Sequence, residues 1–193
     1  MDKSLKQSGL TLIELMIALV LALLVTGTIL TIFISNVKSS SENIKMIQLN
    51  QELRAVIGFM SDELKRAGYS ADPDAATFMD DLAVSAGCIR YSYDEDSDGI
   101  RDGNERFGFQ LNSNAIRWAN NITTADCSSG TWQPLTSDEI NITAFDIQLT
   151  NTASGGGVLV NQLDISVTGE RDLNPGTATR TFTETVRIRN DGT

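Results

Sequence analysis

The sequence predicts an α+β fold, in which one long N-terminal α-helix with a transmembrane first half packs on an antiparallel β-sheet. Three observations predict this fold: an apolar run at residues 10–34, an apolar stripe of helical period that follows it, and alternating strand-like segments in the rest of the chain. With 193 residues, 41% of them hydrophobic, the chain has room for one globular domain and one membrane-length segment.

The apolar run at residues 10–34 directly follows a polar leader that ends in Gly9. At a rise of about 1.5 Å per residue, a helix of this length crosses the roughly 30 Å hydrocarbon core of a membrane. Lys3 and Lys6 precede the run, so the positive-inside bias places the leader in the cytoplasm and the rest of the chain outside. Glu14 lies near the start of the run. Because a charge at mid-membrane costs about 2.5–3.5 kcal/mol, this carboxylate is a candidate functional residue.

Residues 35–67 keep the helical period but become polar, which predicts an amphipathic continuation of one helix over residues 10–67. Gly68 is a good C-terminal cap, and Pro73 prevents further helix. We expect the apolar stripe of this continuation to pack on the sheet of the globular domain. The stripe consists of Leu49, Leu53, Val56, Met60 and Leu64.

After the helix the pattern is that of a β-rich domain, which we assign to residues 68–193. The NSN string at residues 112–114 predicts a tight turn, and the NPG string near residue 175 predicts a longer loop. A meander of this kind predicts an antiparallel sheet with one face on the helix. The expected strands cover residues 88–93, 106–111, 115–119, 140–150, 158–169 and 180–189.

The composition argues against several functional classes. Asp plus Glu outnumber Lys plus Arg by 25 to 15, for a net charge of −10, and a nucleic-acid partner is not expected because such proteins usually present a basic face. Without histidine the chain cannot form a Ser-His-Asp or Cys-His catalytic site or a His-ligated metal site. It also contains no phosphate-loop or dinucleotide-binding motif, so we expect no enzyme activity.

The two cysteines, Cys88 and Cys127, both lie beyond the apolar run. If this part of the chain is periplasmic or extracellular, a disulfide between them is expected. Closing a loop of this length would stabilise the fold by about 3–4 kcal/mol in the chain-entropy model. Two unpaired buried thiols are the alternative.

The acidic string DEDSDGIRDGNE at residues 94–105 matches the calcium-loop pattern D-x-[DN]-x-[DN]-G-x5-E. Hard oxygen donors at this density suit calcium in a structural role. Strands rather than helices are expected on both sides, and Arg101 stands where an apolar residue is usual, so the loop is not a true EF-hand. A solvated acidic hairpin tip is the alternative. The candidate ligands are the side chains of Asp94, Asp96, Asp98, Asp102 and Glu105 and the backbone carbonyl of Ile100.

The string GLTLIELMIALVL, which starts at Gly9, resembles the class III signal and N-terminal helix of type IV pilins and type II secretion pseudopilins, usually written G-F-T-L-I-E-L. The resemblance implies that a prepilin peptidase cuts between Gly9 and Leu10, removes the leader at residues 1–9 and methylates the new N-terminus at Leu10. Leu10 replaces the usual phenylalanine and keeps an apolar first residue. Glu14 would then be a docking residue that pairs with the N-terminal amine of a neighbouring subunit. An uncleaved anchor with a chance glutamate is the alternative.

The string ELKRAGY at residues 63–69 is similar to the stretch that ends the helix in W-type minor pilins, and J-type minor pseudopilins share a related element. The resemblance implies a minor type IV pilin that helps to initiate a pilus or sits at its tip. It would be a single-pass protein of the bacterial inner membrane, with its C-terminal domain in the periplasm, before it enters a filament at the cell surface.

The resemblance also implies the partners. They are other minor and major pilins, the inner-membrane assembly platform, the prepilin peptidase and, before assembly, membrane lipid. Two alternatives stay open for the function: a minor pseudopilin of a type II secretion system, and a calcium-organised adhesin or ligand-binding tip subunit.

Overall fold

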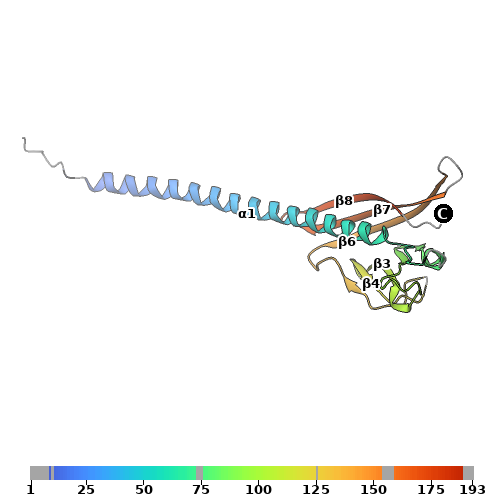
Figure 1. Cartoon of the computed structure of the whole chain (residues 1–193). Helices are drawn as coiled ribbons and strands as arrows, with labels where there is room; N and C mark the ends of the chain where they lie inside the picture. Colours follow the sequence, from blue (N-terminus) through green and yellow to red (C-terminus); the bar gives the residue numbers. More distant parts are fainter. Residues whose placement is uncertain (1–8, 10, 73–75, 125, 154–158, 189–193) are drawn as a thin grey trace, which may run out of the picture. The chain divides into compact units, whose positions relative to one another are not determined.

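The computed structural model describes residues 9, 11–72, 76–124, 126–153 and 159–188 of the chain. These residues form one α-helix, eight β-strands and two short 3-10 helices (Figure 1). The chain divides into two compact units, residues 1–44 and residues 45–193. The α+β class that the sequence predicts is confirmed.

The predicted long helix is confirmed as α1 (Leu12–Leu64), which ends three residues before the predicted end at residue 67. The chain tightens after Leu64, because the N–H of Ala67 bonds to the C=O of Leu64, only three residues back, at 3.2 Å. The N–H of Gly68 bonds instead to the C=O of Ser92 in the β-rich part at 2.9 Å. Gly68 has a φ of 78°, a left-handed conformation that favours glycine, and it caps the helix as predicted.

The strands form two antiparallel sheets, where the sequence predicts one. The elements after α1 are η1 (Ala76–Asp81), β1 (Ala83–Ser85), β2 (Cys88–Ser92), η2 (Gly103–Glu105), β3 (Arg106–Asn112), β4 (Ala115–Ala119), β5 (Gln133–Pro134), β6 (Asn141–Ala153), β7 (Leu159–Asp172) and β8 (Thr177–Arg187). The strand orders are β1-β2-β3-β4-β5 and β6-β7-β8.

The two sheets meet at the turn between β3 and β4. The N–H of Ile142 in β6 bonds there to the C=O of Asn114 at 2.8 Å, and no ladder joins the two sheets within the described residues. The meander divides into two sheets because, among the described residues, β6 pairs with β7 and with no strand of the five-stranded sheet. β1 and β5 are missing from the sequence prediction because strands this short show no recognisable alternation.

The tight turn that the sequence predicts at residues 112–114 is confirmed. Ser113 and Asn114 join β3 to β4, with positive φ angles of 52° and 60°. Positive φ at both central residues is typical of a two-residue hairpin turn, and asparagine tolerates this conformation better than most residues.

The longer loop predicted near residue 175 is wrong. β7 and β8 extend to Asp172 and Thr177, and the N–H of Leu173 bonds to the C=O of Gly176 at 2.8 Å across a tight turn. Apart from Ala178, the residues at these strand ends are polar, so the hydrophobic pattern gives little sign of them.

The core of residues 45–193 lies between α1 and the two sheets, and the predicted stripe faces it. Each fully buried leucine or methionine side chain contributes about 1.5–3 kcal/mol to folding. The stripe therefore supplies much of the energy that holds the sheets on the helix. Its exposed fractions are 0% for Leu49, Leu53, Met60 and Leu64 and 4% for Val56.

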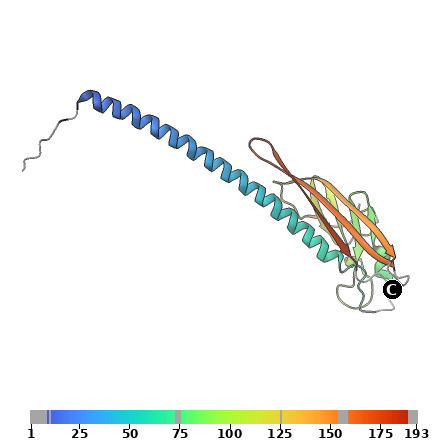
Figure 2. The same ribbon diagram turned by 90° about the horizontal axis from the view of Figure 1, so that it is seen from above.

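Leu53 shows how closely the helix and the three-stranded sheet approach each other. A Cβ atom added to Gly169 in β7 would lie 2.9 Å from a methyl group of Leu53 and 3.3 Å from a methyl group of Ile142. Glycine at this position lets α1 pack directly on the strand, and Figure 2 shows the end of α1 beside the strands. The five-stranded sheet contributes the stacked rings of Tyr91 and Phe109, whose centroids lie 5.7 Å apart.

Replacing Gly108 in β3 by alanine should destabilise the fold by about 1–3 kcal/mol, because an added methyl group overpacks the core. A Cβ atom there would lie 2.6 Å from a methyl group of the buried Ile122 and 2.7 Å from the carbonyl oxygen of Ile89. The backbone carbonyl cannot move away without breaking its strand. The measurement is thermal unfolding of the purified protein in detergent.

Gly58→Ala is the matched control, since Gly58 lies within α1 and a Cβ atom added to it would meet nothing within 4 Å. Alanine should stabilise the helix there by about 0.5–1 kcal/mol. Equal melting temperatures for the two variants would contradict the packing described for β3.

Candidate functional site

The N-terminus of α1 is closed by Thr11 and Glu14. The Glu14 carboxylate accepts hydrogen bonds from the N–H and the hydroxyl of Thr11, both at 2.9 Å, and the N–H of Glu14 donates to the Thr11 hydroxyl at 3.3 Å. This reciprocal arrangement is a capping box, which satisfies N–H groups that lack a partner within the helix. Glu14 therefore has a role within its own chain that the sequence analysis missed, although the T-x-x-E spacing of residues 11–14 is its signal.

The predicted cleavage site lies just before this cap. Gly9 is exposed, and Leu10 lies outside the described residues. Cleavage between them, methylation of Leu10 and the docking role of Glu14 therefore stay predictions.

The first half of α1 exposes apolar side chains on all its sides. From Leu12 to Ile34 the large apolar side chains are 54–78% exposed within the chain. An 18-residue window of the helix has a mean hydropathy of 2.7 and no buried residue, so by length and composition it can cross a membrane. Contact of such an apolar surface with water is unfavourable, so the surface needs lipid or other helices around it.

The acidic loop is fastened at its first residue, Asp94. The N–H of Asp94 donates to the C=O of Tyr69 at 2.9 Å, and the Asp94 carboxylate accepts the N–H of Ala71 at 2.9 Å and that of Gly99 at 3.0 Å. The N–H of Ala71 is the main reason why the pKa of Asp94 is lowered, and other loop N–H groups add to it. The side chain is only 2% exposed, so the loop begins on a buried carboxylate that stays ionised.

Three of the predicted calcium ligands converge. One carboxylate oxygen from each of Asp94, Asp96 and Asp98 lies within 4.8 Å of the others. Calcium binds oxygen ligands at about 2.3–2.6 Å, so a single ion between the three oxygens fits this spacing. Gly99 takes a φ of 76°, and an added Cβ atom would lie 2.9 Å from the side chain of Asp72, so the loop needs glycine here for two reasons.

The carboxylates of Asp102 and Glu105 do not join this group, and the predicted contact through the backbone carbonyl of Ile100 stays a prediction. The two carboxylate oxygens of Glu105 accept the N–H groups of Glu95 and Asp102, at 2.8 and 2.9 Å, and the side chain is 1% exposed. Glu105 thereby links the beginning and the end of the loop through hydrogen bonds to its backbone. Ile100 donates its N–H to Asp98 at 2.7 Å and exposes 63% of its own side chain.

An ion pair with Asp81 accounts for Arg101, the arginine that stands where the calcium-loop pattern usually has an apolar residue. Its guanidinium lies 3.2 Å from the carboxylate of Asp81, at the end of η1. Arg90 of β2 and Arg106 of β3 contact the same carboxylate at 3.2 and 3.1 Å. Asp81 is only 7% exposed, so its carboxylate is a buried charge. Through its three arginine partners it links η1 to the acidic loop, β2 and β3. The sequence analysis missed this cluster, whose signal is the arginine in place of an apolar residue.

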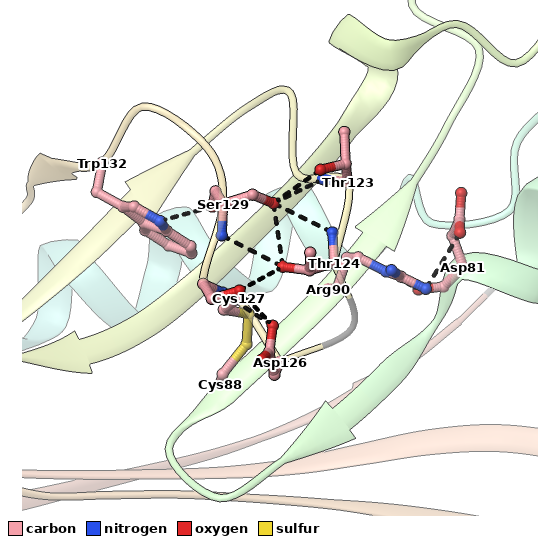
Figure 3. The surroundings of a disulfide bond; sticks show 10 residues. Asp81, Cys88, Arg90, Thr123, Thr124, Asp126, Cys127, Ser129 and Trp132 are labelled. Carbon is pink, nitrogen blue, oxygen red and sulfur yellow. Dashed lines mark hydrogen bonds and ion pairs between the residues drawn. A yellow bond between two sulfur atoms is a disulfide. The ribbon is translucent and has the colours of Figure 1, made fainter.

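The predicted disulfide is present in the structure, and Cys88 and Cys127 have Cα atoms 6.5 Å apart. Figure 3 shows hydroxyl and carboxylate groups gathered around Cys127. The hydroxyl of Ser128 donates to Asp126 at 2.7 Å and is the main reason why the pKa of Asp126 falls to about 2. The indole N–H of Trp132 donates to the C=O of Ser129 at 2.9 Å. Hydrogen bonds to Asp126 on one side and to Trp132 on the other therefore hold residues 128 and 129, which follow the disulfide.

A polar network lies where α1 ends against the five-stranded sheet. The buried carboxylate of Glu63 accepts the hydroxyls of Tyr91 and Tyr93 at 3.4 and 3.3 Å, and Arg66 lies 3.5 Å from it. Burial, followed by the charge of Glu63, raises the pKa of Tyr93 to about 12 and that of Tyr91 well above its usual value. Both tyrosines therefore stay protonated hydrogen-bond donors, as a structural network requires.

Comparisons with known proteins bear on both halves of the chain. The family model of the prokaryotic N-terminal methylation motif matches residues 4–30, and that of prepilin peptidase-dependent protein B matches residues 42–188. A type IV-like pilin from Thermus thermophilus has a similar structure, with a TM-score of 0.51 and 14% identity over 75% of this chain and 98% of that chain. No curated protein matches the chain in sequence.

The methylation motif and the fold define a type IV pilin-like protein of the prepilin class. The chain belongs to the family of prepilin peptidase-dependent protein B. This membership implies processing by a prepilin peptidase and assembly with other pilins, and it makes a structural role typical. The N-terminal motif and the apolar helix are consistent with membrane anchoring and export to a pilus.

Replacing both Cys88 and Cys127 by serine should lower the free energy of unfolding by about 2–5 kcal/mol, because the open chain gains conformational entropy when it unfolds. Chemical denaturation of the purified protein in detergent measures the change. Thiol titration of the denatured, unreduced wild-type protein should find no free thiol, and two free thiols would contradict the disulfide.

Calcium at the acidic loop stays a prediction, and thermal unfolding tests it. Saturating calcium should raise the melting temperature of the wild-type protein by about 3–8 °C, because an ion that binds the folded state alone stabilises it. Asp96→Asn and Asp98→Asn should abolish the shift. Asp138→Asn removes an exposed acid outside the loop and should keep it. If millimolar calcium leaves the melting temperature of the wild-type protein unchanged, the acidic string at residues 94–105 is better interpreted as a solvated hairpin tip.

Proposed function

We propose that the protein is a minor pilin, a structural subunit that helps to initiate a type IV pilus or sits at its tip. The observation that carries the proposal is a methylation motif at residues 4–30 that runs into the first half of α1, where the apolar side chains are exposed within residues 1–44. The match of residues 42–188 to a prepilin peptidase-dependent family supports it from the other half of the chain.

The apolar half of α1 supplies the assembly step. Before assembly its side chains contact lipid, and in the filament they contact the helices of neighbouring subunits. Exchange between the two surroundings costs little, since both are apolar, so a motor can move the subunit without unfolding it. The β-rich unit would lie in the periplasm before this step and on the surface of the filament after it.

In this proposal, Glu14 sets the axial position of each incoming subunit relative to its neighbour. The carboxylate can accept more hydrogen bonds than those from Thr11, and a neighbour's N-terminal amine would bring the opposite charge. Two charges that are costly in an apolar surrounding stabilise each other when they meet, and removal of one leaves the other buried without a partner. The docking contact would thus favour one axial position of the incoming subunit.

The W-type assignment is the finer part of the proposal and rests on the string at residues 63–69. In the structure, this string packs the end of α1 against residues 92–94, at the end of β2 and just beyond it. Gly68 donates to Ser92, Tyr69 accepts the N–H of Asp94, and the guanidinium of Arg66 lies 5.6 Å from the ring centroid of Tyr93. The contacts of Gly68 and Tyr69 are made by the backbone. The residue types of the string matter at Gly68, whose φ of 78° favours glycine, and at Arg66, whose guanidinium contacts the ring of Tyr93.

Two other functions compete with this proposal. A minor pseudopilin of a type II secretion system would have the same signal and helix. A ligand-binding tip subunit is favoured by a hollow of about 460 Å³ beside the acidic loop, with both charges and two tyrosine rings in its lining. The hollow is lined by Lys65, Arg66, Tyr69, Tyr93, Asp94, Glu95 and Ser97.

The test is to shear filaments from cells and to identify the N-terminal peptide by mass in the filament and membrane fractions. We expect a methylated peptide that begins at Leu10 in the sheared filaments. The same peptide in membranes alone would favour the secretion pseudopilin. A peptide that still begins at Met1 in both fractions would overturn the prepilin assignment.

Two variants separate processing from docking in the same experiment. A bulky residue at Gly9 should leave the protein at full length, because the peptidase needs the small residue before the cut. Glu14→Gln should be cleaved normally but become at least about tenfold depleted in filaments, since it cannot pair with the amine of a neighbour. Asp138→Asn, an exposed acid outside the helix, should assemble like the wild type.

A further inference from the structure

The hollow beside the acidic loop has the size of a small-molecule site. Its volume of about 460 Å³ lies within the range of about 300–1,000 Å³ that is usual for such sites. Three segments of the chain line it: the segment that follows α1, Tyr93 just beyond β2, and the start of the acidic loop. A ligand in the hollow would therefore contact all three segments at once.

Hydrogen bonds to the backbone hold these segments together, so the hollow is formed without a ligand. The N–H of Gly68 donates to the C=O of Ser92 at 2.9 Å, and the N–H of Asp94 donates to the C=O of Tyr69 at 2.9 Å. The Asp94 carboxylate in turn accepts the N–H of Ala71 at 2.9 Å. A preformed site of this kind loses little conformational entropy when it binds a ligand.

Two tyrosine rings give the hollow an apolar surface. Tyr69 is 42% exposed, whereas Tyr93 is 6% exposed and carries the Arg66 guanidinium 5.6 Å from its ring centroid. Tyr69 is thus the ring whose face a ligand can cover. An exposed tyrosine ring beside polar groups suits a ligand that has an apolar face and polar edges.

The polar lining combines charged donors from the end of the helix with a charged acceptor from the loop. The side chains of Lys65 and Arg66 are 40% and 59% exposed, so a ligand can reach both. Within the described residues, the polar contacts of Arg66 to Glu63 and Tyr93 both go through the nitrogen Nη1, at 3.5 Å, so its other N–H groups can serve a ligand. Glu95 lines the hollow with an exposed side chain and offers carboxylate oxygens.

The charges around the hollow disfavour an ionic ligand. Lys65 and Arg66 each pair with an acid three residues before them, at 3.0 and 3.5 Å, so they leave no excess positive charge for an anion. The same two cations oppose a cationic ligand. A neutral polyhydroxyl ligand has neither disadvantage, because each hydroxyl group can donate to a carboxylate and accept from a guanidinium or an ammonium group.

We propose that the hollow binds a neutral sugar, as one pyranose ring with its face on Tyr69. The C–H groups of the sugar cover the exposed part of the tyrosine ring, and its hydroxyl groups donate to Glu95 and accept from Arg66. This proposal names the ligand class of the ligand-binding alternative given above, and it holds for either type of filament.

Saturation-transfer NMR of the full chain with glucose, galactose and mannose tests the proposal. The detergent must lack a sugar headgroup, because such a headgroup would compete for the site. We expect at least one hexose to bind with a Kd of about 1–10 mM, as suits a ligand of this size. The uronate and the 2-amino sugar of the same ring control for charge, and each should bind at least about tenfold more weakly than the neutral hexose.

Variants test the two contacts separately. Tyr69→Ala should weaken binding of the hexose at least about tenfold, because the sugar face loses its cover, whereas Tyr69→Phe should stay within about twofold of the wild type. Glu95→Gln should weaken binding at least about fivefold, since a charge-assisted hydrogen bond becomes a neutral one. Leu149→Ala and Asp138→Asn change exposed side chains outside the hollow and should bind like the wild type. All these variants should melt near the wild-type temperature, because the side chains are exposed.

Three outcomes would overturn the proposal: no hexose that binds in the millimolar range, a charged sugar that binds better than its neutral parent, or binding that Tyr69→Ala leaves unchanged. None of them affects which N-terminal peptide is found in sheared filaments. Failure of the sugar site and failure of the filament assignment are therefore distinguishable.

Discussion

The burial of one helical stripe is the constraint on which the rest of the globular unit depends. Leu49, Leu53, Met60 and Leu64 lose all contact with solvent where α1 meets the two sheets. The sheets themselves share hardly any backbone bonding, so the helix is the element that joins them into one core. Gly169 makes the contact possible, because any larger residue would hold the helix away from β7.

The same helix changes its surroundings along its length, and the change needs no break in its backbone. Before Ile34 the apolar side chains have no cover within their unit, and after Leu49 they form a narrow buried stripe with polar neighbours. Lipid or other helices suit the first pattern, and a protein core suits the second. A subunit built in this way can exchange the contacts of its first half and keep those of its second half intact.

Buried charges position the acidic loop. Asp94 and Glu105 hold its two ends through backbone N–H groups, and Asp81 binds Arg101 from within it. Each carboxylate is satisfied by specific partners, which is the condition under which burial of a charge is tolerated. The convergence of three carboxylates at the start of the loop is thus a property of the folded hairpin rather than of an unstructured tip.

The sequence by itself determined the elements whose patterns are local: the apolar run, the stripe, the NSN turn, the cap at Gly68 and the methylation motif. Residue types and their periodicity contain this information because each pattern repeats within a few turns of helix or residues of strand. Only the tertiary structure decided that the strands divide into two sheets, that Asp81 gathers three arginines, and that Glu105 turns inward to its own loop. These features depend on which segments meet across long sequence distances, and no local pattern encodes that choice.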